Sequence, residues 1–561
     1  MSVLVNEIKE EIKNRILTAI NKEIENGSFE KAELPEFRIE VPQDTAFGDY
    51  AANAAMIWAK TLKSNPRAIA TAIANNFKTD EKICKIEVAG PGFLNFFLGD
   101  SFFSEIIKDV IKKDSDYGKS NAFSNKKVLV EFVSANPTGP MHIGNARGGA
   151  LGDCLSSVLN FAGYKADREF YVNDAGNQIE KFKTSLETRY LQLFDNKVEM
   201  PEDAYLGEDI IEHAKSFAEI YKDEYVNKDA DLRRQALCDF ALPKNIANLK
   251  TDLLKYRIEY DKWYHESELH NSGKVTEILN KLKESGYTYE KDGALWFNSE
   301  KLGDEKDRVL VRKDGVPTYL VPDIAYHYEK LTSRNYDIAI DVLGADHHGY
   351  VPRLKAALTA LGVDANRLKV VIMQMVRLVK NGETYKLSKR SGKAVTLSTL
   401  LDEVPLDAAR FIFNSKEPNT HLEFDLDLAV EKSSENPVYY VQYAYARICS
   451  IIRLLKSEGI EYKDLTNDEL NLLTTAEERD LVRHLSAFSE EIETSAKNLD
   501  PSRITRYTYE TATKFHKFYN ACRVKCDKEE LMYARLSLCV AVKTVLKNCF
   551  SILKIEALEE M

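Results

Sequence analysis

The stretch Ala135-Asn136-Pro137-Thr138-Gly139-Pro140-Met141-His142-Ile143-Gly144-Asn145 decides how this chain folds. Before it, residues 128–133 are mostly apolar and predict a buried parallel strand. After it, apolar residues recur at helical spacing from Leu151 to Leu159 and stop near Gly163. The stretch is therefore a strand-to-helix turn with His142 where the helix begins. Open α/β sheets bind nucleotides at such turns, where free N–H groups favour phosphate oxygens. Taken alone, the stretch also fits an ordinary connection whose Pro and Gly residues serve only geometry.

A second stretch, Lys386-Leu387-Ser388-Lys389-Arg390-Ser391-Gly392-Lys393, is strongly basic. Between Arg377 and Lys393 six basic residues stand against one acid, Glu383. A basic run is commonly a solvated face. Here small residues are interleaved with the charges, which suits a mobile loop that closes over phosphates.

Together the two stretches resemble the two signatures of class I aminoacyl-tRNA synthetases. The wider context, Glu131 to Asn145 followed by Gly148-Gly149-Ala150-Leu151-Gly152-Asp153, is similar to arginyl-tRNA synthetases in particular. This resemblance implies activation of L-arginine by ATP, used as a substrate with Mg²⁺, to arginyl-adenylate. Arginine would then pass to the 3′-terminal ribose of tRNA(Arg) for protein synthesis. The implied fold is a Rossmann-like, doubly wound parallel-sheet catalytic domain with an α+β N-terminal domain and an all-α C-terminal anticodon-binding bundle.

Composition sets limits on these expectations. The 561 residues suffice for several domains, and 44% hydrophobic with 29% charged residues is an ordinary balance for a folded chain. No long apolar run or basic leader is present, and the eight cysteines form no CxxC pair, so we expect a cytoplasmic protein with reduced thiols. The net charge of −11 argues mildly against a nucleic-acid partner. A tRNA-binding chain with this charge must gather its basic residues on one surface.

Residues 1–115 look like a separate α+β domain. Apolar residues at every fourth position from Leu4 to Ile20 predict an amphipathic helix, and residues 85–97 predict strand, turn and strand. The domain is similar to the N-terminal domain of the family, which contacts the tRNA elbow. Phe93 and Asn95 match the motif for that contact. The alternative is that Phe93 is a core residue and Asn95 an ordinary surface residue of a strand.

Residues 120–430 are interpreted as the catalytic domain. Its strands are expected at 128–133, 308–312, 337–343 and 368–376, and their alternation with helices predicts a parallel, doubly wound sheet. Residues 181–305 lack this alternation and are interpreted as an insertion. His265 and His270 in that range have no partners at metal-ligand spacing, so no metal site is expected.

Residues 431–561 are predicted to be helical throughout. Their beginning, Asn436 to Arg447, resembles the first helix of the family's anticodon-binding bundle. Tyr443 and Tyr445 in that helix are interpreted as core aromatics rather than base-stacking residues.

The resemblance assigns an ATP site to both signatures. His142, Gly144 and Asn145 lie at the helix start, and His142 is able to donate a hydrogen bond to a phosphate. Lys386 and Lys389 would neutralise charge on the leaving pyrophosphate, and Ser388 would bond the nucleotide or fix the loop. Gly344 and Asp346 match the family's adenosine-binding segment. Asn145 replaces the usual second histidine, which keeps hydrogen bonding but removes an ionised role at that position.

Substrate identity rests on acids, because a guanidinium is best held by carboxylates. Glu131 lies in a predicted buried strand, where a carboxylate needs a cationic partner. Asp323 lies near a predicted helix start, where a simple capping role is the alternative. Five further positions match the family's arginine-binding residues: Ser134, Asn136, His142, Tyr319 and His347. Pro322 departs from the basic residue more common there.

Three rival interpretations differ in class. Another class I synthetase is disfavoured by Glu131 together with Asp323, and a non-tRNA nucleotidyltransferase is too small to explain the C-terminal bundle. A catalytically inactive RNA-binding relative is disfavoured because His142, Lys386 and Lys389 are all present. The expected partners are tRNA(Arg) and L-arginine, with no DNA, no membrane and a monomeric state.

Overall fold

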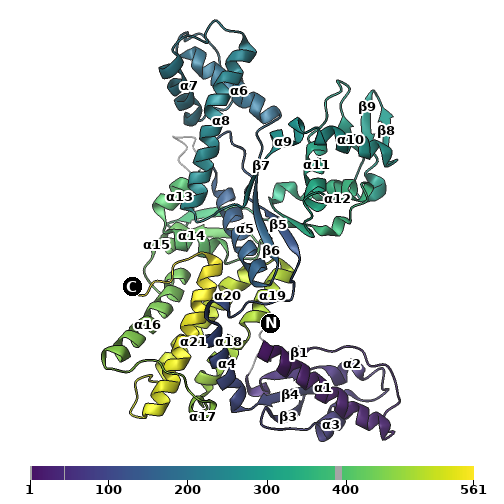
Figure 1. The fold of residues 1–561 in the computed structure, drawn as a ribbon, viewed down its shortest axis with the longest axis vertical. Helices are drawn as coiled ribbons and strands as arrows, with labels where there is room; N and C mark the ends of the chain where they lie inside the picture. The colour runs from purple at the N-terminus through teal and green to yellow at the C-terminus, as the bar shows by residue number, and fades with distance from the viewer. Residues whose placement is uncertain (1–2, 43–44, 386–394) are drawn as a thin grey trace.

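The fold is described by a computed structural model that covers residues 3–42, 45–385 and 395–561. Figure 1 shows the central sheet in the middle of an elongated molecule, with two lobes on one side and the terminal domains on the other. The predicted fold class is confirmed: an α+β domain, a domain with a parallel sheet and a helical bundle follow one another along the chain.

The N-terminal domain is a four-stranded antiparallel sheet, in the order β1-β2-β4-β3, packed with helices. Helix α1 confirms the predicted amphipathic helix, since Ile8, Ile12, Ile16 and Ile20 are all buried. The elements are α1 (Val3–Glu25), β1 (Ile39–Glu40), β2 (Tyr50–Ala52), α2 (Ala54–Trp58), α3 (Pro66–Asn76), β3 (Ile83–Ala89), β4 (Phe93–Leu98) and α4 (Asp100–Lys113).

The central sheet has five parallel strands in the order β12-β11-β5-β6-β7. They are β5 (Lys127–Glu131), β6 (Lys165–Val172), β7 (Lys262–His265), β11 (Ile338–Gly344) and β12 (Leu368–Met373), and α5 (Ile143–Phe161) joins β5 to β6. The chain runs outward from β5 to β7 and then returns to β11 on the other side of β5. This reversal makes the carboxyl ends of β5 and β11 the topological switch point, where such sheets bind ligands.

The structure divides the range 181–305, because β7 lies inside it and is an edge strand of the parallel sheet. One helical lobe precedes β7: α6 (Asn177–Gln192), α7 (Glu208–Tyr221) and α8 (Ala230–Lys255). A second lobe follows β7: α9 (Glu266–Asn271), α10 (Lys274–Glu284), β8 (Thr288–Lys291), β9 (Ala294–Phe297), β10 (Arg308–Val311), α11 (Leu320–Leu331) and α12 (Val351–Ala360).

Two strand predictions need correction. Residues 308–312 form a strand, but β10 pairs antiparallel with β9 in a separate three-stranded sheet. Only Leu310 of β10 is fully buried, whereas a strand of a parallel sheet is covered on both faces. Residues 368–376 do not form one strand either. The strand β12 ends at Met373, and β13 (Val376–Lys380) belongs to another small sheet with β14 (Glu383–Thr384) and β15 (Leu422–Asp425).

The C-terminal region is helical, as predicted. After α13 (Leu397–Glu403), α14 (Leu406–Phe413) and α15 (Leu426–Val430), it contains α16 (Pro437–Ser457), α17 (Asn467–Leu470), α18 (Ala476–Ser486), α19 (Phe488–Asn498), α20 (Ser502–Ala521) and α21 (Glu529–Leu553). Helix α21 is long and apolar enough to cross a membrane, but 78% of its most apolar window is buried inside the protein. It packs against α20, α16 and α4, and is therefore the core helix of the bundle (Figure 1).

Arg410 on α14 ties the bundle to the catalytic domain. Its guanidinium is fully buried and pairs with Asp153 on α5. It also donates to the carbonyl oxygens of Leu553, at the end of α21, and Tyr256, just after α8, each at 2.9 Å. One buried cation thus joins the signature helix, the insertion and the last helix of the chain.

We predict that Arg410→Met lowers the free energy of unfolding by about 3–5 kcal/mol, the range for breaking a buried ion pair. Arg453→Met is the control, since its partner Glu560 is 80% exposed and such surface pairs contribute about 0–1 kcal/mol. Urea unfolding followed by circular dichroism measures both variants. Equal midpoints for the two variants would contradict a joining role for Arg410.

Candidate functional site

The backbone that leads into the signature turn is strained. Val133 and Ser134 have φ angles of 68° and 40°, a region that a β-branched residue such as valine rarely adopts. Ser134 Oγ donates to Glu131 Oε1 at 2.9 Å and accepts from the Tyr171 N–H at 3.1 Å. Such conformations cost about 1–3 kcal/mol each and cluster at functional sites. The hydrogen bonds of Ser134 to β5 and β6 hold the strained backbone of Val133 and Ser134 in place.

His142 is the N-cap residue of the signature helix α5. The His142 N–H donates to the Asn145 side-chain oxygen at 3.0 Å, so Asn145 caps the helix start. The His142 side chain is exposed beside the cap. Asn145, which stands in place of a second histidine, therefore has a structural role as the cap, while the His142 side chain remains accessible to a ligand.

The structure brings the two signature regions together through backbone hydrogen bonds. The Ile143 N–H donates to Val395 O at 3.1 Å, and the Leu397 N–H donates to Met141 O at 2.9 Å. Lys386, Ser388 and Lys389 lie outside the described residues, so their predicted roles stay predictions. The described residues that follow this basic stretch are nevertheless fixed directly against the start of α5.

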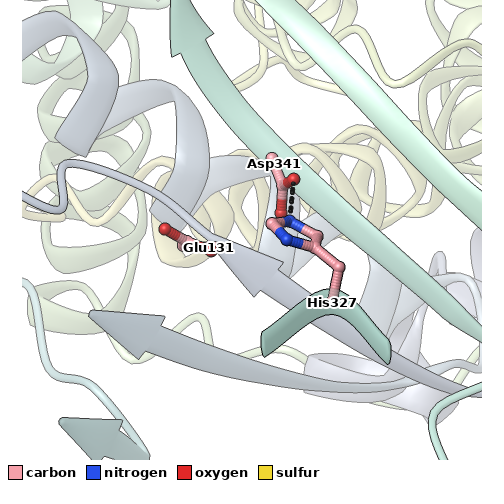
Figure 2. A group of neighbouring side chains, drawn as sticks. All are labelled: Glu131, His327 and Asp341. Carbon is pink, nitrogen blue, oxygen red and sulfur yellow. Dashed lines mark hydrogen bonds and ion pairs between the residues drawn. The ribbon is translucent and has the colours of Figure 1, made fainter. Parts of the chain in front are cut away.

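A buried ionic cluster connects the two strands of the switch point. Lys330 on α11 donates to Glu131 Oε2 on β5 at 2.6 Å and to Asp341 Oδ1 on β11 at 3.1 Å. His327 Nε2 lies 2.8 Å from Asp341 Oδ2, and His327 Nδ1 lies 2.8 Å from the Asp323 carbonyl oxygen. Figure 2 shows the His327 ring facing Asp341, with Glu131 nearby. Both ring nitrogens face acceptors, which favours the doubly protonated imidazolium.

In this cluster the two basic side chains, Lys330 and His327, are matched by two acidic ones, Glu131 and Asp341. Burial and Lys330 favour a low pKa for His327, but Asp341 outweighs them and raises that pKa. Burial would raise the pKa of Asp341, but Lys330 and His327 lower it. Burial raises the pKa of Glu131 against the attraction of Lys330. The oxygen and nitrogen atoms of Glu131, His327 and Asp341 are close enough to hold a metal ion, but the Lys330 ammonium already occupies the cation position.

A second acidic group lies beside the switch point, where Asp323 is partly exposed and Glu266 and Asp174 are mostly buried. Asp323 is in the first turn of α11, Glu266 begins α9 directly after β7, and Asp174 follows β6. Burial, with Asp323 and Asp174 nearby, raises the pKa of Glu266 to about 7. Among the described residues, none of these three carboxylates pairs with a lysine or an arginine; their closest basic partners are histidines. The arrangement suits a cationic ligand that supplies the missing charge.

Glu266 and Asp174 were missed by the sequence analysis. Each lies next to the carboxyl end of a parallel strand, β7 and β6 respectively, which is where functional side chains gather in such sheets. Recognising β7 in residues 262–265 would have drawn attention to Glu266. Asp174 is held by its neighbours, since it accepts from the Ser267 N–H and hydroxyl, both at 2.9 Å.

The other predicted site residues fall in three places. Asn136 is exposed, and its amide lies 3.2 Å from that of Asn173; Tyr319 is 54% exposed at the start of α11. Asp346 and His347 follow β11 at Gly344, and both side chains are largely exposed. Phe93 and Asn95 lie in the distant N-terminal sheet, where Phe93 is 38% exposed and Asn95 is buried (Figure 1).

The C-terminal bundle carries an exposed aromatic surface on α16 and α20. Tyr443 stacks with Tyr439 at 6.2 Å, and the Arg447 guanidinium lies 4.6 Å from the Tyr443 ring and 4.7 Å from the Tyr519 ring. Tyr445 is buried, as predicted. The interpretation of Tyr443 as a core residue was wrong, because it lies two positions away on a helix and so faces outward.

We predict that Lys330→Met destabilises the protein more at pH 8 than at pH 5. Without the ammonium, burial raises the folded-state pKa of Glu131 further above that of the unfolded chain. A carboxyl whose pKa is raised by folding costs stability as the pH rises above its unfolded value. The penalty at pH 8 should reach about 3–5 kcal/mol. Thermal unfolding at both pH values measures it, with Lys283→Met on the exposed face of α10 as control. A pH-independent penalty would contradict this account of the cluster.

Comparison with known protein families gives consistent matches along the chain. Residues 6–98 match the "Arginyl tRNA synthetase N terminal domain", residues 106–434 match "tRNA synthetases class I (R), catalytic domain", and residues 441–561 match the "DALR anticodon binding domain".

Whole proteins match over their full length. The arginine–tRNA ligase of Caldanaerobacter subterraneus subsp. tengcongensis is 52% identical, and that of Acetivibrio thermocellus is 50% identical, each with all of both chains covered. A crystal structure of a putative arginyl-tRNA synthetase from Campylobacter jejuni is 36% identical, with a TM-score of 0.74 over 83% of this chain and 100% of that one. The arginyl-tRNA synthetase of Thermus thermophilus, 21% identical, shares the fold with a TM-score of 0.76 over 99% of this chain and 100% of that one.

Proposed function

The chain belongs to the arginyl-tRNA synthetase family, and we propose that it joins L-arginine to tRNA(Arg) with ATP in the crevice between β5 and β11. The observation that carries the assignment of the substrate pocket is the group of carboxylates Glu266, Asp323 and Asp174, which lack a lysine or arginine partner among the described residues. A guanidinium offers five donors in a plane and is well matched by several carboxylates. Tyr319, Ser134, Asn136 and His347 would complete the pocket.

Glu131 supports the arginine pocket in this proposal and does not contact arginine directly, although its position in the sequence suggested direct binding. Both of its oxygens have partners within the protein, Lys330 and Ser134. We propose that Glu131 contributes negative charge beneath the pocket and holds the strained turn, while Asp323 and Glu266 make the direct contacts. Asp323 is 33% exposed at its side chain, which leaves room for a ligand.

The ATP phosphates would lie at the start of α5, opposite the acids. Arginine's carboxylate would attack the α-phosphate, and pyrophosphate would leave; Mg²⁺ that enters with ATP would offset the charge of the phosphates. Positioning and charge stabilisation carry such a step. His142 would donate to a phosphate oxygen, Gly144 and Asn145 would shape the helix start, and Gly344 and Asp346 would meet the adenosine. Lys386, Ser388 and Lys389 would act on the leaving group. The 2′-hydroxyl of the terminal ribose then takes the arginyl group.

Contacts with tRNA are proposed at both ends of the chain. Phe93 would meet the elbow, and Asn95, which is buried, would help to hold the strand that carries Phe93. The exposed surface of Tyr439, Tyr443, Arg447 and Tyr519 would stack with unpaired bases of the anticodon loop. Base–aromatic stacking contributes about 1–3 kcal/mol per base and does not depend on net charge, which suits an acidic protein. We propose a cytoplasmic monomer, since the reaction serves protein synthesis.

The test is ATP–pyrophosphate exchange with each amino acid in turn, with and without tRNA, followed by charging of tRNA(Arg). Exchange with arginine and transfer to tRNA(Arg) are expected. Exchange with another amino acid would reject the pocket assignment, and tRNA binding without exchange would favour an inactive RNA-binding relative.

We predict that the arginine KM rises as the pH falls from 8 to 6, because a protonated Glu266 loses the negative charge that strengthens its hydrogen bond with the guanidinium. Its pKa of about 7 places the change in this window, and arginine binding should release a proton there. Glu266→Gln should remove this pH dependence and raise the arginine KM by roughly 10- to 100-fold, the value of a charge-assisted hydrogen bond. The ATP KM should change little.

Glu268→Gln is the matched control for this prediction. Glu268 is exposed on the same short helix and should keep both the KM and its pH dependence. Calorimetry in buffers of different ionisation enthalpy measures the released proton. If Glu266→Gln raises the KM values for arginine and ATP equally, the carboxylate is structural and the pocket lies elsewhere.

A further inference from the structure

Helix α8, in the lobe before β7, passes directly against the signature turn. Asn245 on α8 is 5% exposed, and its Nδ2 donates to the Pro137 carbonyl oxygen at 3.0 Å. His213 on α7 donates from Nε2 to Asn245 Oδ1 at 2.7 Å. Both polar ends of the Asn245 amide are thus used, one toward the lobe and one toward the turn. We propose that Asn245 is a positioning residue that fixes the turn on which His142 is carried.

The turn needs such a partner for a simple reason. Pro137 is buried and, as a proline, has no N–H, so its carbonyl is its one backbone polar group. A buried carbonyl without a partner costs about 1–3 kcal/mol. The contact from Asn245 removes that cost only when the turn lies where the structure has it. Helix α7 also packs over the turn, since a side chain at Gly139 would meet Asp209 Oδ2 at 3.8 Å.

Helix α8 is suited to hold a position because its end is anchored in the catalytic core. Arg410 donates to Tyr256 O at 2.9 Å, Arg257 donates to Asp407 at 2.6 Å, and Lys255 donates to Asp402 at 2.6 Å. These bonds fix the C-terminal end of α8, beyond Asn245. His213 on α7 holds Asn245 itself. The helical lobe therefore acts as a brace for the nucleotide side of the site.

The inference rests on the proposed function and makes a distinct kinetic claim. The acids that would hold arginine come from α9, α11 and the end of β6, and Asn245 contacts none of them. Loss of its hydrogen bond should therefore displace His142 relative to the phosphates and leave the arginine pocket intact. A small misplacement of a reacting group costs up to about 100-fold in rate. We expect kcat of pyrophosphate exchange to fall roughly 10- to 100-fold while the arginine KM stays within about two-fold.

Two variants test this. Asn245→Leu keeps the branching and the number of side-chain heavy atoms and removes both hydrogen bonds. Asn245→Asp keeps the hydrogen bond from His213 but places an oxygen against the Pro137 carbonyl oxygen. This second variant tests the proposal if Asn245→Leu does not fold. Asn248→Leu is the matched control, since Asn248 is exposed on the same helix. Hydrogen–deuterium exchange of a peptide covering residues 137–145 reports on the turn without any need for activity.

Faster deuterium exchange in that peptide, together with lower kcat and an unchanged arginine KM, is the expected result for both Asn245 variants. Full kcat in Asn245→Asp, or unchanged deuterium exchange of the turn, would overturn the proposal. A fall in kcat with an equal change in the arginine KM would also overturn it. Failure of the proposed function is seen separately, as absent exchange with arginine in the unmodified protein, and leaves the deuterium measurement valid.

Discussion

The Lys330 ammonium, buried between Glu131 on β5 and Asp341 on β11, is the interaction on which the crevice depends. These two strands are neighbours in the sheet, and Glu131 is paired in register with Asp341. Two carboxylates side by side in a buried sheet would repel each other and force one to take up a proton. A cation from α11 resolves this, and in doing so it attaches α11 to the switch point. The helix start that carries Asp323 is placed by the same contact.

A metal ion would satisfy the same acids, yet a lysine gives the fold something that an ion cannot. The ammonium is covalently part of α11, so the position of the helix is tied to the charge balance of the sheet. His327, one turn earlier, links Asp341 to the Asp323 carbonyl and passes that constraint to the start of the helix. The cluster around Lys330 is electrically balanced, whereas the acidic group of Asp323, Glu266 and Asp174 has no lysine or arginine partner among the described residues. Balanced charges indicate that the cluster around Lys330 is structural. The missing positive charge indicates that the second acidic group binds a cationic ligand.

Sequence patterns were sufficient for the parts of the fold with strong periodicity or a distinctive turn. The strand expected at 128–133, observed as β5 (Lys127–Glu131), and the helix after His142 were predicted because burial on both faces and a 3.6-residue repeat leave clear patterns. Strand β7 was missed because Lys262 to His265 is short and mixes polar with aromatic residues. Strand β10 was assigned to the wrong sheet because a short apolar run does not reveal its partner. Glu266 and Lys330 could not be identified, since each acquires its role from residues distant in sequence.

The position of the acids relative to the signature turn also explains how an acidic chain can handle a polyanionic substrate. A guanidinium binds to carboxylates, whereas phosphates bind to hydrogen-bond donors and positive charges. The two kinds of site interfere with each other if they share one surface, because carboxylates repel phosphates. In this structure the acids end strands and begin helices around α9 and α11, while the proposed phosphate side is the start of α5, where His142 is exposed. The turn from Ser134 to His142 is the boundary between the two environments. Its strain and its several supports from β6, α8 and residues 395–397 follow from that position, because a turn that shifted would mix charges that the site must keep apart.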